Sequence, residues 1–218
     1  MTNGRAMAAR ADHDTPTRRR WGEAREILIV FLLAVTAILT AWCGFESSKW
    51  GGQMSIQFSQ ASGARIQSVD FASASRDARA VDLAIYTEWV LATARGDSAL
   101  ADYVSDRFSP DLAVAFDHSQ AGGQELASPF RDPSYVPAGT EEAAAASDRA
   151  DAKFDAALQS NHRGDNYSIL TVLFAMVLFF TAMSQRSTSP CAGWFLLGLG
   201  IVVAVAGMVI LATFPVLI

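Results

Sequence analysis

The sequence contains few of the residues that build metal, redox and catalytic sites. It has two cysteines, Cys43 and Cys191, and three histidines scattered at positions 13, 118 and 162. Neither cysteine has the paired spacing of a metal or redox site, and no two histidines stand four residues apart. A glycine-rich phosphate loop after a strand and a G-x-S-x-G motif are also absent. The sequence therefore predicts no metal and no cofactor, and we expect a protein that is not an enzyme.

Charge is absent from three long stretches, residues 27–45, 169–183 and 194–218. At a rise of about 1.5 Å per residue, the first stretch matches the roughly 30 Å of a bilayer's hydrocarbon core. The second is at the short end of the range, and tryptophans at positions 42 and 50 bracket the point where the first stretch turns polar. We predict transmembrane helices over residues 21–45, 166–184 and 194–218, with a loop at 185–193.

Apart from Arg186, the remaining charge is divided between two regions of opposite sign. Six arginines and four acidic residues precede Ile27, whereas residues 46–165 hold ten basic and eighteen acidic residues. The acidic middle region gives no indication of a nucleic-acid partner. The basic cluster Arg18–Arg20 predicts that the N-terminus stays in the cytoplasm. Residues 1–20, which mix Gly, Pro and charge without a hydrophobic period, are interpreted as a disordered cytoplasmic tail.

This topology predicts a multi-pass protein of the bacterial plasma (inner) membrane whose residues 46–165 are extracytoplasmic and whose 185–193 loop is cytoplasmic. Residues 18–43 also have the basic and apolar parts of a signal peptide. However, an Ala-x-Ala site is missing and the apolar run continues to Phe45. The bulky Trp42 just before Cys43 argues against a lipoprotein site. We therefore expect an uncleaved signal-anchor.

The middle region is predicted to be helical on both sides of one irregular segment. From residue 46 to residue 95 there is no proline. Arg95-Gly96-Asp97 is typical of a helix stop followed by a new N-cap. Residues 120–139 hold three prolines and three glycines and are predicted to form a loop at the tip. A second long helix is expected from Thr140 back to the bilayer, so the fold class is all-α, with three transmembrane helices and a long extracytoplasmic helical hairpin.

Two faces of the first long helix are predicted to be buried by packing. The first is an apolar stripe at helical spacing: Ile66, Val69, Ala80, Leu83, Thr87, Val90, Leu91 and Ala94. The second is a set of small residues that includes Gly51, Gly52 and Gly63, where helix backbones can approach closely. In the third span, Gly200 and Ala204 form a similar small-residue pair. Ordinary transmembrane composition explains that pair equally well.

The candidate site residues gather where the first span ends. Trp42, Glu46, Lys49 and Trp50 are predicted to form an interface collar at headgroup depth. Glu46, Gln53, Gln57 and Gln60 follow at helical i,i+3 and i,i+4 steps and form a polar stripe. The stripe is either the solvated or hydrogen-bonded face of a stalk, or the lining of a water-filled space between copies of the chain. We favour the stalk, because no span carries a charge.

Residues 42–53, WCGFESSKWGGQ, resemble a pattern in uncharacterised bacterial three-span membrane proteins. In these proteins an aromatic-rich end of the first span leads into a Ser/Ala-rich helix. Asp165-Asn166-Tyr167 before the second span, and Ser128-Pro129-Phe130 ahead of residues 133–136, extend the similarity. Gly44 departs from the pattern, which has a larger residue or Ser at that position. The resemblance implies the topology described above but no activity.

The sequence thus favours a structural or accessory protein of the bacterial envelope. We expect it to contact the lipid bilayer and to form a homo-oligomer or join a larger membrane complex through its small-residue helix faces. The alternative is an oligomeric channel or transport component lined by the Glu46–Gln60 stripe. A third possibility is a sensor whose 120–139 loop binds a ligand, although the sequence offers no cytoplasmic output domain.

Overall fold

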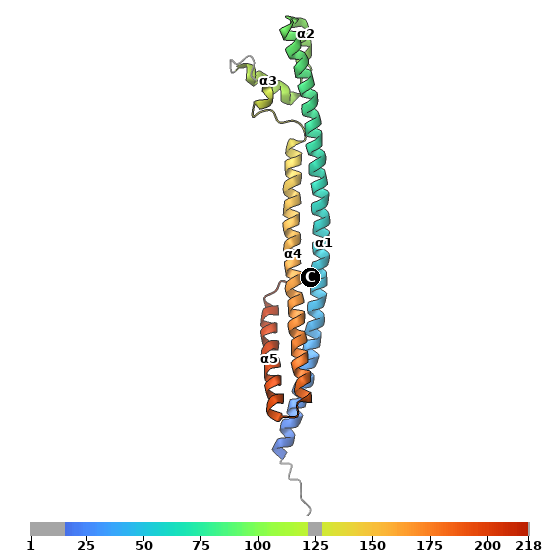
Figure 1. The fold of residues 1–218 in the computed structure, drawn as a ribbon, viewed down its shortest axis with the longest axis vertical. Helices are drawn as coiled ribbons and strands as arrows, with labels where there is room; N and C mark the ends of the chain where they lie inside the picture. The colour runs from blue at the N-terminus through green and yellow to red at the C-terminus, as the bar shows by residue number, and fades with distance from the viewer. Residues whose placement is uncertain (1–15, 122–127, 218) are drawn as a thin grey trace, which may run out of the picture. The chain divides into compact units, whose positions relative to one another are not determined.

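The computed structural model describes residues 16–121 and 128–217, and every regular element in them is helical. The elements are α1 (Pro16–Ala94), α2 (Ser98–Ser105), α3 (Pro110–Ala121), the short 3-10 helix η1 (Pro129–Arg131), α4 (Thr140–Arg186) and α5 (Pro190–Ala212) (Figure 1). Helices α1, α4 and α5 are each long and apolar enough to cross a membrane. The prediction of an all-α protein with three spans is therefore confirmed.

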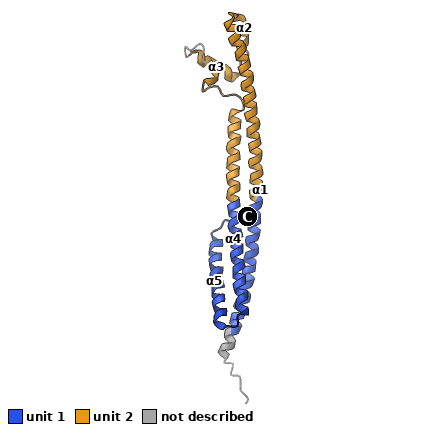
Figure 2. Ribbon diagram, in the orientation of Figure 1, with its two compact units in different colours: residues 1–52, 161–218 blue, residues 53–160 orange. Residues whose placement is uncertain are grey.

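The chain divides into two compact units, which α1 and α4 both enter (Figure 2). Unit 1 comprises residues 1–52 and 161–218, and unit 2 comprises residues 53–160. The first part of α1, the second part of α4 and all of α5 form the described part of unit 1. The rest of α1 and α4, together with α2, α3 and η1, forms that of unit 2.

In unit 1, small residues let α5 lie close against α4. A Cβ atom on Gly200 would stand 3.2 Å from Thr181 Oγ1, and one on Gly207 would stand 2.7 Å from Leu173 Cδ2. Ala204, between them on the same face, is buried. Because lipid tails are as apolar as side chains, such close packing is a main source of helix association within a membrane. Residues 193–207 of α5 thus run antiparallel to residues 173–184 of α4.

Several predicted boundaries in unit 1 are wrong. Residues 16–20 belong to α1 and not to a disordered tail, while the rest of that predicted tail lies outside the described residues. The loop predicted at 185–193 shrinks to residues 187–189, because α4 continues to Arg186 and α5 begins at Pro190, a residue suited to a first helical turn. The third span ends at Ala212 rather than continuing, and residues 213–217 leave the helix.

In unit 2, α1 and α4 pack as antiparallel helices. The contacts progress in opposite directions along the two chains: Gln57 accepts a hydrogen bond from Ser160, Ser68 donates to Ala143 O, and Ser75 bonds Thr140. Gly139, at φ +91°, begins the return, and a Cβ there would stand 2.7 Å from Phe71 O. The hairpin therefore needs glycine at this turn, for its backbone conformation and for the close approach.

The helix stop after α1 has the predicted form. Gly96 adopts φ +73°, its N–H donates to Thr93 O, and Asp97 N–H donates to Ala92 O, which is the Schellman pattern. The Asp97 carboxylate then accepts from Leu100 N and caps α2. The predicted 120–139 loop is shorter, since α3 reaches Ala121 and η1 occupies 129–131. Residues 122–127 lie outside the described part.

The predicted apolar stripe on α1 is not the buried face of unit 2. Ile66, Val69 and Leu83 are each more than half exposed. The buried positions of α1 in unit 2 are instead Ala61, Asp82 and Ala92. Tyr86 and Trp89, which lie between the last two, enter a cluster of aromatic rings. Hydrophobic periodicity alone misplaced the face, because aromatic packing and one buried carboxylate decide which side of the helix turns inward.

Candidate functional site

The collar residues divide between the outside and the inside of unit 1. Trp42 is 44% exposed and Phe45 is 55% exposed, with their ring centroids 6.0 Å apart. Glu46 and Trp50 are instead buried, at 1% and 4% exposure. The outward pair fits the headgroup region of a bilayer, where amphipathic aromatic rings collect. The inward pair belongs to the packed interior of unit 1.

Glu46 and Lys49 bind the backbone of the same distant residue. Glu46 Oε2 accepts a hydrogen bond from Leu217 N at 3.0 Å, and Lys49 Nζ donates to Leu217 O. The two side chains therefore satisfy both backbone groups of a residue beyond the end of α5. In the described part of the chain they form no direct ion pair with each other.

Tyr167 of α4 completes this attachment of the 213–217 segment. Its hydroxyl donates to Pro215 O at 3.0 Å, and its ring meets Phe214 edge-on at 5.4 Å. Pro215 has no N–H, so the chain cannot continue α5 through this position with full hydrogen bonding. Residues 213–217 instead run as a non-helical strap held from α1 by Glu46 and Lys49 and from α4 by Tyr167. We call this arrangement the strap site.

The strap lies over the main apolar core of unit 1. Phe214 and Leu217 pack against a cluster of buried residues with these members: Cys43, Trp50, Tyr167, Leu170, Phe174, Val177 and Ala204. Cys43 is fully buried and free, whereas Cys191 is free and exposed. Burial of apolar surface contributes roughly 25 cal/mol per Å², so the strap both covers the core and is stabilised by it.

Next to the strap site, α4 lies close to α1. Ser47 Oγ donates to Gly164 O at 3.0 Å and lies 2.9 Å from Ser168 Oγ. The Arg163 guanidinium stacks over the Trp50 ring at 4.7 Å. Gly164 lies against α1, since a Cβ there would be in ordinary van der Waals contact with Trp50 Cβ at 3.5 Å. The polar residues of this region thus hold two helices together as they leave the apolar zone.

The polar stripe is divided by these contacts. Glu46 binds Leu217 in unit 1, and Gln57 accepts from Ser160 in unit 2. Gln53 is half-buried and Gln60 is exposed. Glu46 and Gln57 therefore have hydrogen-bond partners within the same chain. The four side chains of the stripe do not form a continuous polar surface.

The predicted packing glycines have different surroundings. Gly200 and Ala204 lie against α4, as described above. A Cβ on Gly51, Gly52 or Gly63 would meet nothing within 4 Å in the structure. Side chains at Gly52 and Gly63 would therefore point into open space, whereas the backbone N of Gly51 lies 3.9 Å from the Cβ position of Gly164 in α4. Gly207, which the sequence analysis did not select, has the tightest contact with α4.

A second polar centre, missed in the sequence, lies in unit 2. The buried Asp82 carboxylate accepts hydrogen bonds from Ser109 Oγ and Tyr135 Oη, both at 2.9 Å. Ser109 in turn caps α3 by accepting from Leu112 N. Burial and the bond to Asp82 raise the pKa of Tyr135 well above its usual value. The only sequence signal was an acid between apolar neighbours, Val81 and Leu83.

Aromatic rings surround the Asp82 centre. The rings form a chain of edge-on, tilted and stacked contacts at 4.8–6.5 Å: Tyr86, Trp89, Phe108, Phe116, Phe130 and Tyr135. Beside them, two hydrogen bonds from Ser134 lower the pKa of Asp132. This cluster attaches α3 and η1 to α1. Its polar groups, Asp82, Ser109 and Tyr135, are hydrogen-bonded to one another. It is therefore a structural centre.

The described residues contain no group of three or more His, Cys, Asp or Glu side chains able to hold a metal ion. The candidate site is thus an attachment site for backbone, built from Glu46, Lys49 and Tyr167 where two spans end. No protein-family model matches this chain, and no curated protein or solved structure is similar to it.

Proposed function

We propose that this chain is a non-enzymatic structural or accessory protein of the bacterial envelope, which associates with itself or with a larger membrane complex. It lies in the plasma (inner) membrane with its N-terminus in the cytoplasm and unit 2 outside. The juxtamembrane arginines before the first span support this orientation. The bacterial assignment rests on the resemblance of residues 42–53 to bacterial three-span proteins.

One observation carries the proposal: α1 has an exposed apolar face in unit 2. Ile56 and Ile66 are 55% and 63% exposed, and Ser59 and Gly63 lie between them at 3- and 4-residue spacing. This spacing places all four on one side of the helix, as in the seam of a coiled coil. The residues that bond α4, such as Gln57 and Ser68, lie on another side.

The composition of this face favours a helix as its partner. Gly63 and Ser59 are small enough for another backbone to approach, while Ile56 and Ile66 supply apolar area. Exposed apolar surface outside the spans has no lipid to cover it, and such surfaces mark interaction sites. A second copy of α1 would present the same face, so a two-fold contact would be self-complementary.

The rival proposal, a channel lined by the polar stripe, has less support. A pore between copies requires polar groups that face the space between them. Glu46 and Gln57 are engaged within their own chain, and Glu46 is almost completely buried. The stripe would have to break these bonds before it could line a pore.

Replacing Gly63 by leucine is expected to abolish or strongly weaken the assembly. The added side chain meets nothing within 4 Å in the single chain, so the fold should tolerate it. A neighbouring helix at the Gly63 face would be pushed away. The particle mass in native membranes or mild detergent, measured by mass photometry or native electrophoresis, should fall from an oligomer toward 23.4 kDa per chain plus bound lipid.

Gly63→Ala is the matched control, because it also improves helix propensity but keeps the face small. It should assemble like the unmodified protein. Equal masses for the leucine and alanine variants would contradict packing through this face. An unmodified protein that is monomeric in native membranes would contradict self-association. A mixed particle would identify the partner as a different protein.

A further inference from the structure

Unit 2 has a groove of about 270 Å³ between α1 and α4. It is lined by four residues of α1 and two of α4: Phe58, Ala61, Ser62, Arg65, Ala150 and Phe154. The two alanines, one from each helix, are buried and form its floor. Toward one end of the groove, the rings of Phe58 and Phe154 meet edge-on at 5.4 Å. Toward the other end, Arg65 forms an ion pair with Asp151.

The hairpin of unit 2 has its small residues inside and its large apolar residues outside. Where α1 and α4 face one another, the buried residues are small: Ala61, Ala146, Ala150, Ala157 and Ser160. Five large apolar side chains of the same stretch are instead at least 40% exposed: Ile56, Ile66, Val69, Phe154 and Leu158. Hydrophobic stabilisation grows with the apolar area buried, so two helices alone gain little from this seam. The distribution fits a hairpin that buries its large side chains against a further helix.

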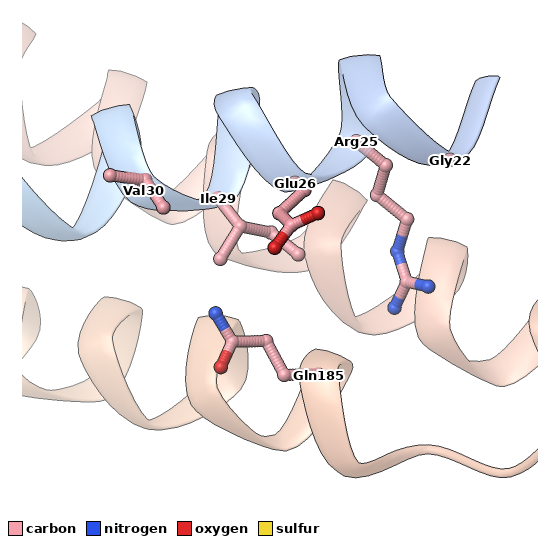
Figure 3. A pocket seen from close by; sticks show the side chains of 6 residues that line it. All are labelled: Gly22, Arg25, Glu26, Ile29, Val30 and Gln185. Atoms are coloured by element: carbon pink, nitrogen blue, oxygen red, sulfur yellow. The ribbon is translucent and has the colours of Figure 1, made fainter. Parts of the chain in front are cut away.

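The Gly63 face of α1 (Ile56, Ser59, Gly63 and Ile66) has the charge pattern that suits this groove. The sequence carries no charge from residue 50 to residue 64. The one charged lining residue, Arg65, is already paired within its own chain. An uncharged helix face can therefore enter the groove without leaving an unpaired charge. The hollow of unit 1 beside Arg25 and Glu26 is unlike this groove, because its lining has two charged side chains and no aromatic ring (Figure 3).

Attachment to one bilayer sets the Gly63 face and the groove at the same height in different copies. Copies held by the same spans stand parallel, with each residue of α1 at the same level. The Gly63 face covers residues 56–66, and the groove is lined by residues 58–65 of the same helix. Phe154 of α4 contacts Phe58 and so lies within this range of heights. The bulky, exposed ring of one copy is thus level with the small residues of the Gly63 face in the next.

We propose that the Gly63 face of one copy occupies the groove of a second copy. This inference rests on the proposed self-association and specifies its contact. A two-fold contact between two Gly63 faces would leave the groove empty, whereas this contact covers the face of one copy and the groove of the other. Because the face and the groove are different surfaces, the contact is heterologous, and its repetition can join more than two copies.

The test places the photo-crosslinking residue p-benzoylphenylalanine at position 154 of the full-length protein in native membranes. This residue keeps an aromatic ring at the groove and reacts with C–H bonds close to it. We expect a covalent product of two copies, and peptide mass spectrometry should locate the link within residues 56–66 of the second copy. Gly63→Leu should lower the yield of this product about tenfold, because an overpacked face cannot enter the groove.

Phe71 is the matched control position. It is also an exposed phenylalanine of unit 2, but it does not line the groove. The same photo-crosslinking residue at position 71 should give no link to residues 56–66 of another copy. Gly63→Ala keeps the face small and should leave the yield from position 154 unchanged.

Three results would overturn the proposal. Links from position 154 only to its own chain, or to a second copy outside residues 56–66, would remove the groove from the contact. A link to a different protein would assign the groove to another partner. Equal yields with leucine and alanine at position 63 would show that this face does not enter the groove. In each case a particle that remains oligomeric leaves the proposed self-association standing, whereas a monomeric native protein overturns both.

Discussion

Replacing Glu46 by alanine is expected to release the 213–217 strap from unit 1. The carboxylate holds Leu217 N from a nearly fully buried position, and hydrogen bonds to charged groups contribute about 1.5–3 kcal/mol each. The loss should raise the population of open strap by roughly ten- to a hundredfold. Lys49 and Tyr167 would still bond the segment, through Leu217 O and Pro215 O, but neither binds Leu217 N.

Cys43 provides the measurement for this release. It is buried in the core against which Phe214 and Leu217 pack, while Cys191 is exposed. A membrane-permeant maleimide should label Cys191 rapidly in every variant and Cys43 only when the strap opens. Labelling of Cys43 should therefore accelerate in Glu46→Ala, with Cys191 as the internal reference.

Glu46→Gln separates charge from hydrogen bonding at this position. Glutamine keeps an acceptor for Leu217 N but has no charge. The labelling rate of Cys43 in this variant should therefore fall between the rates in the native protein and in the alanine variant. Glu23→Ala, an exposed acid on the same helix, controls for loss of charge alone. If Cys43 stays protected in Glu46→Ala, the strap is held by apolar packing and the carboxylate contributes little.

Replacing Asp82 by alanine is expected to loosen the aromatic cluster of unit 2. The substitution removes the shared acceptor of Ser109 and Tyr135 and leaves the buried Tyr135 hydroxyl without a partner. Two bonds to a charged acceptor imply a loss of about 3 kcal/mol or more in the stability of this region. Since Ser109 also caps α3, the helix start should fray as well.

The fluorescence of Trp89 and the near-UV circular dichroism of the cluster should both report this change, because Trp89 stacks with Tyr86 and meets Phe116 edge-on. Limited proteolysis should cut faster between α3 and α4. Asp82→Asn keeps an acceptor and should therefore lose less of the stability of this region. Asp77→Ala, at an exposed acid, should behave like the native protein. Equal proteolysis of the Asp82 and Asp77 alanine variants would contradict the assigned role.

Alkaline titration gives a second readout of the same centre. Burial, followed by the bond to Asp82, raises the pKa of Tyr135 above the unfolded value of about 10. The stabilisation linked to the neutral phenol is therefore complete below about pH 10 and is lost as pH rises through the folded pKa. In Asp82→Asn the ultraviolet absorbance of ionised Tyr135 should appear at lower pH than in the native protein.

Local sequence was sufficient for features that depend on length and composition. The number of spans follows from charge-free stretches, because a charge in hydrocarbon is costly and the bilayer sets the length. The stop at Arg95-Gly96-Asp97 follows from the freedom of glycine at positive φ and from the side-chain oxygen of aspartate. These features need no knowledge of the rest of the chain.

The candidate site could be predicted only in part. The sequence selected Glu46, Lys49 and the two collar tryptophans from their position at the end of a span. It did not reveal that Glu46 binds residue 217, because that contact joins positions 171 apart and involves a backbone group. Backbone groups are the same in every residue, so no sequence pattern identifies such a partner.

The sequence by itself determined that this chain is all-helical and that three helices can cross a membrane. It also determined that the first of these helices stops at Arg95-Gly96-Asp97. Only the tertiary structure decided which face of α1 is buried in unit 2, that the last described residues leave α5, and that Gly207 rather than Gly63 packs within the chain. The physical reason is the distance along the chain over which each effect acts. Propensity, capping and hydropathy act over a few residues, whereas burial of Asp82, the strap and the α4–α5 contact depend on groups brought together from distant parts of the chain.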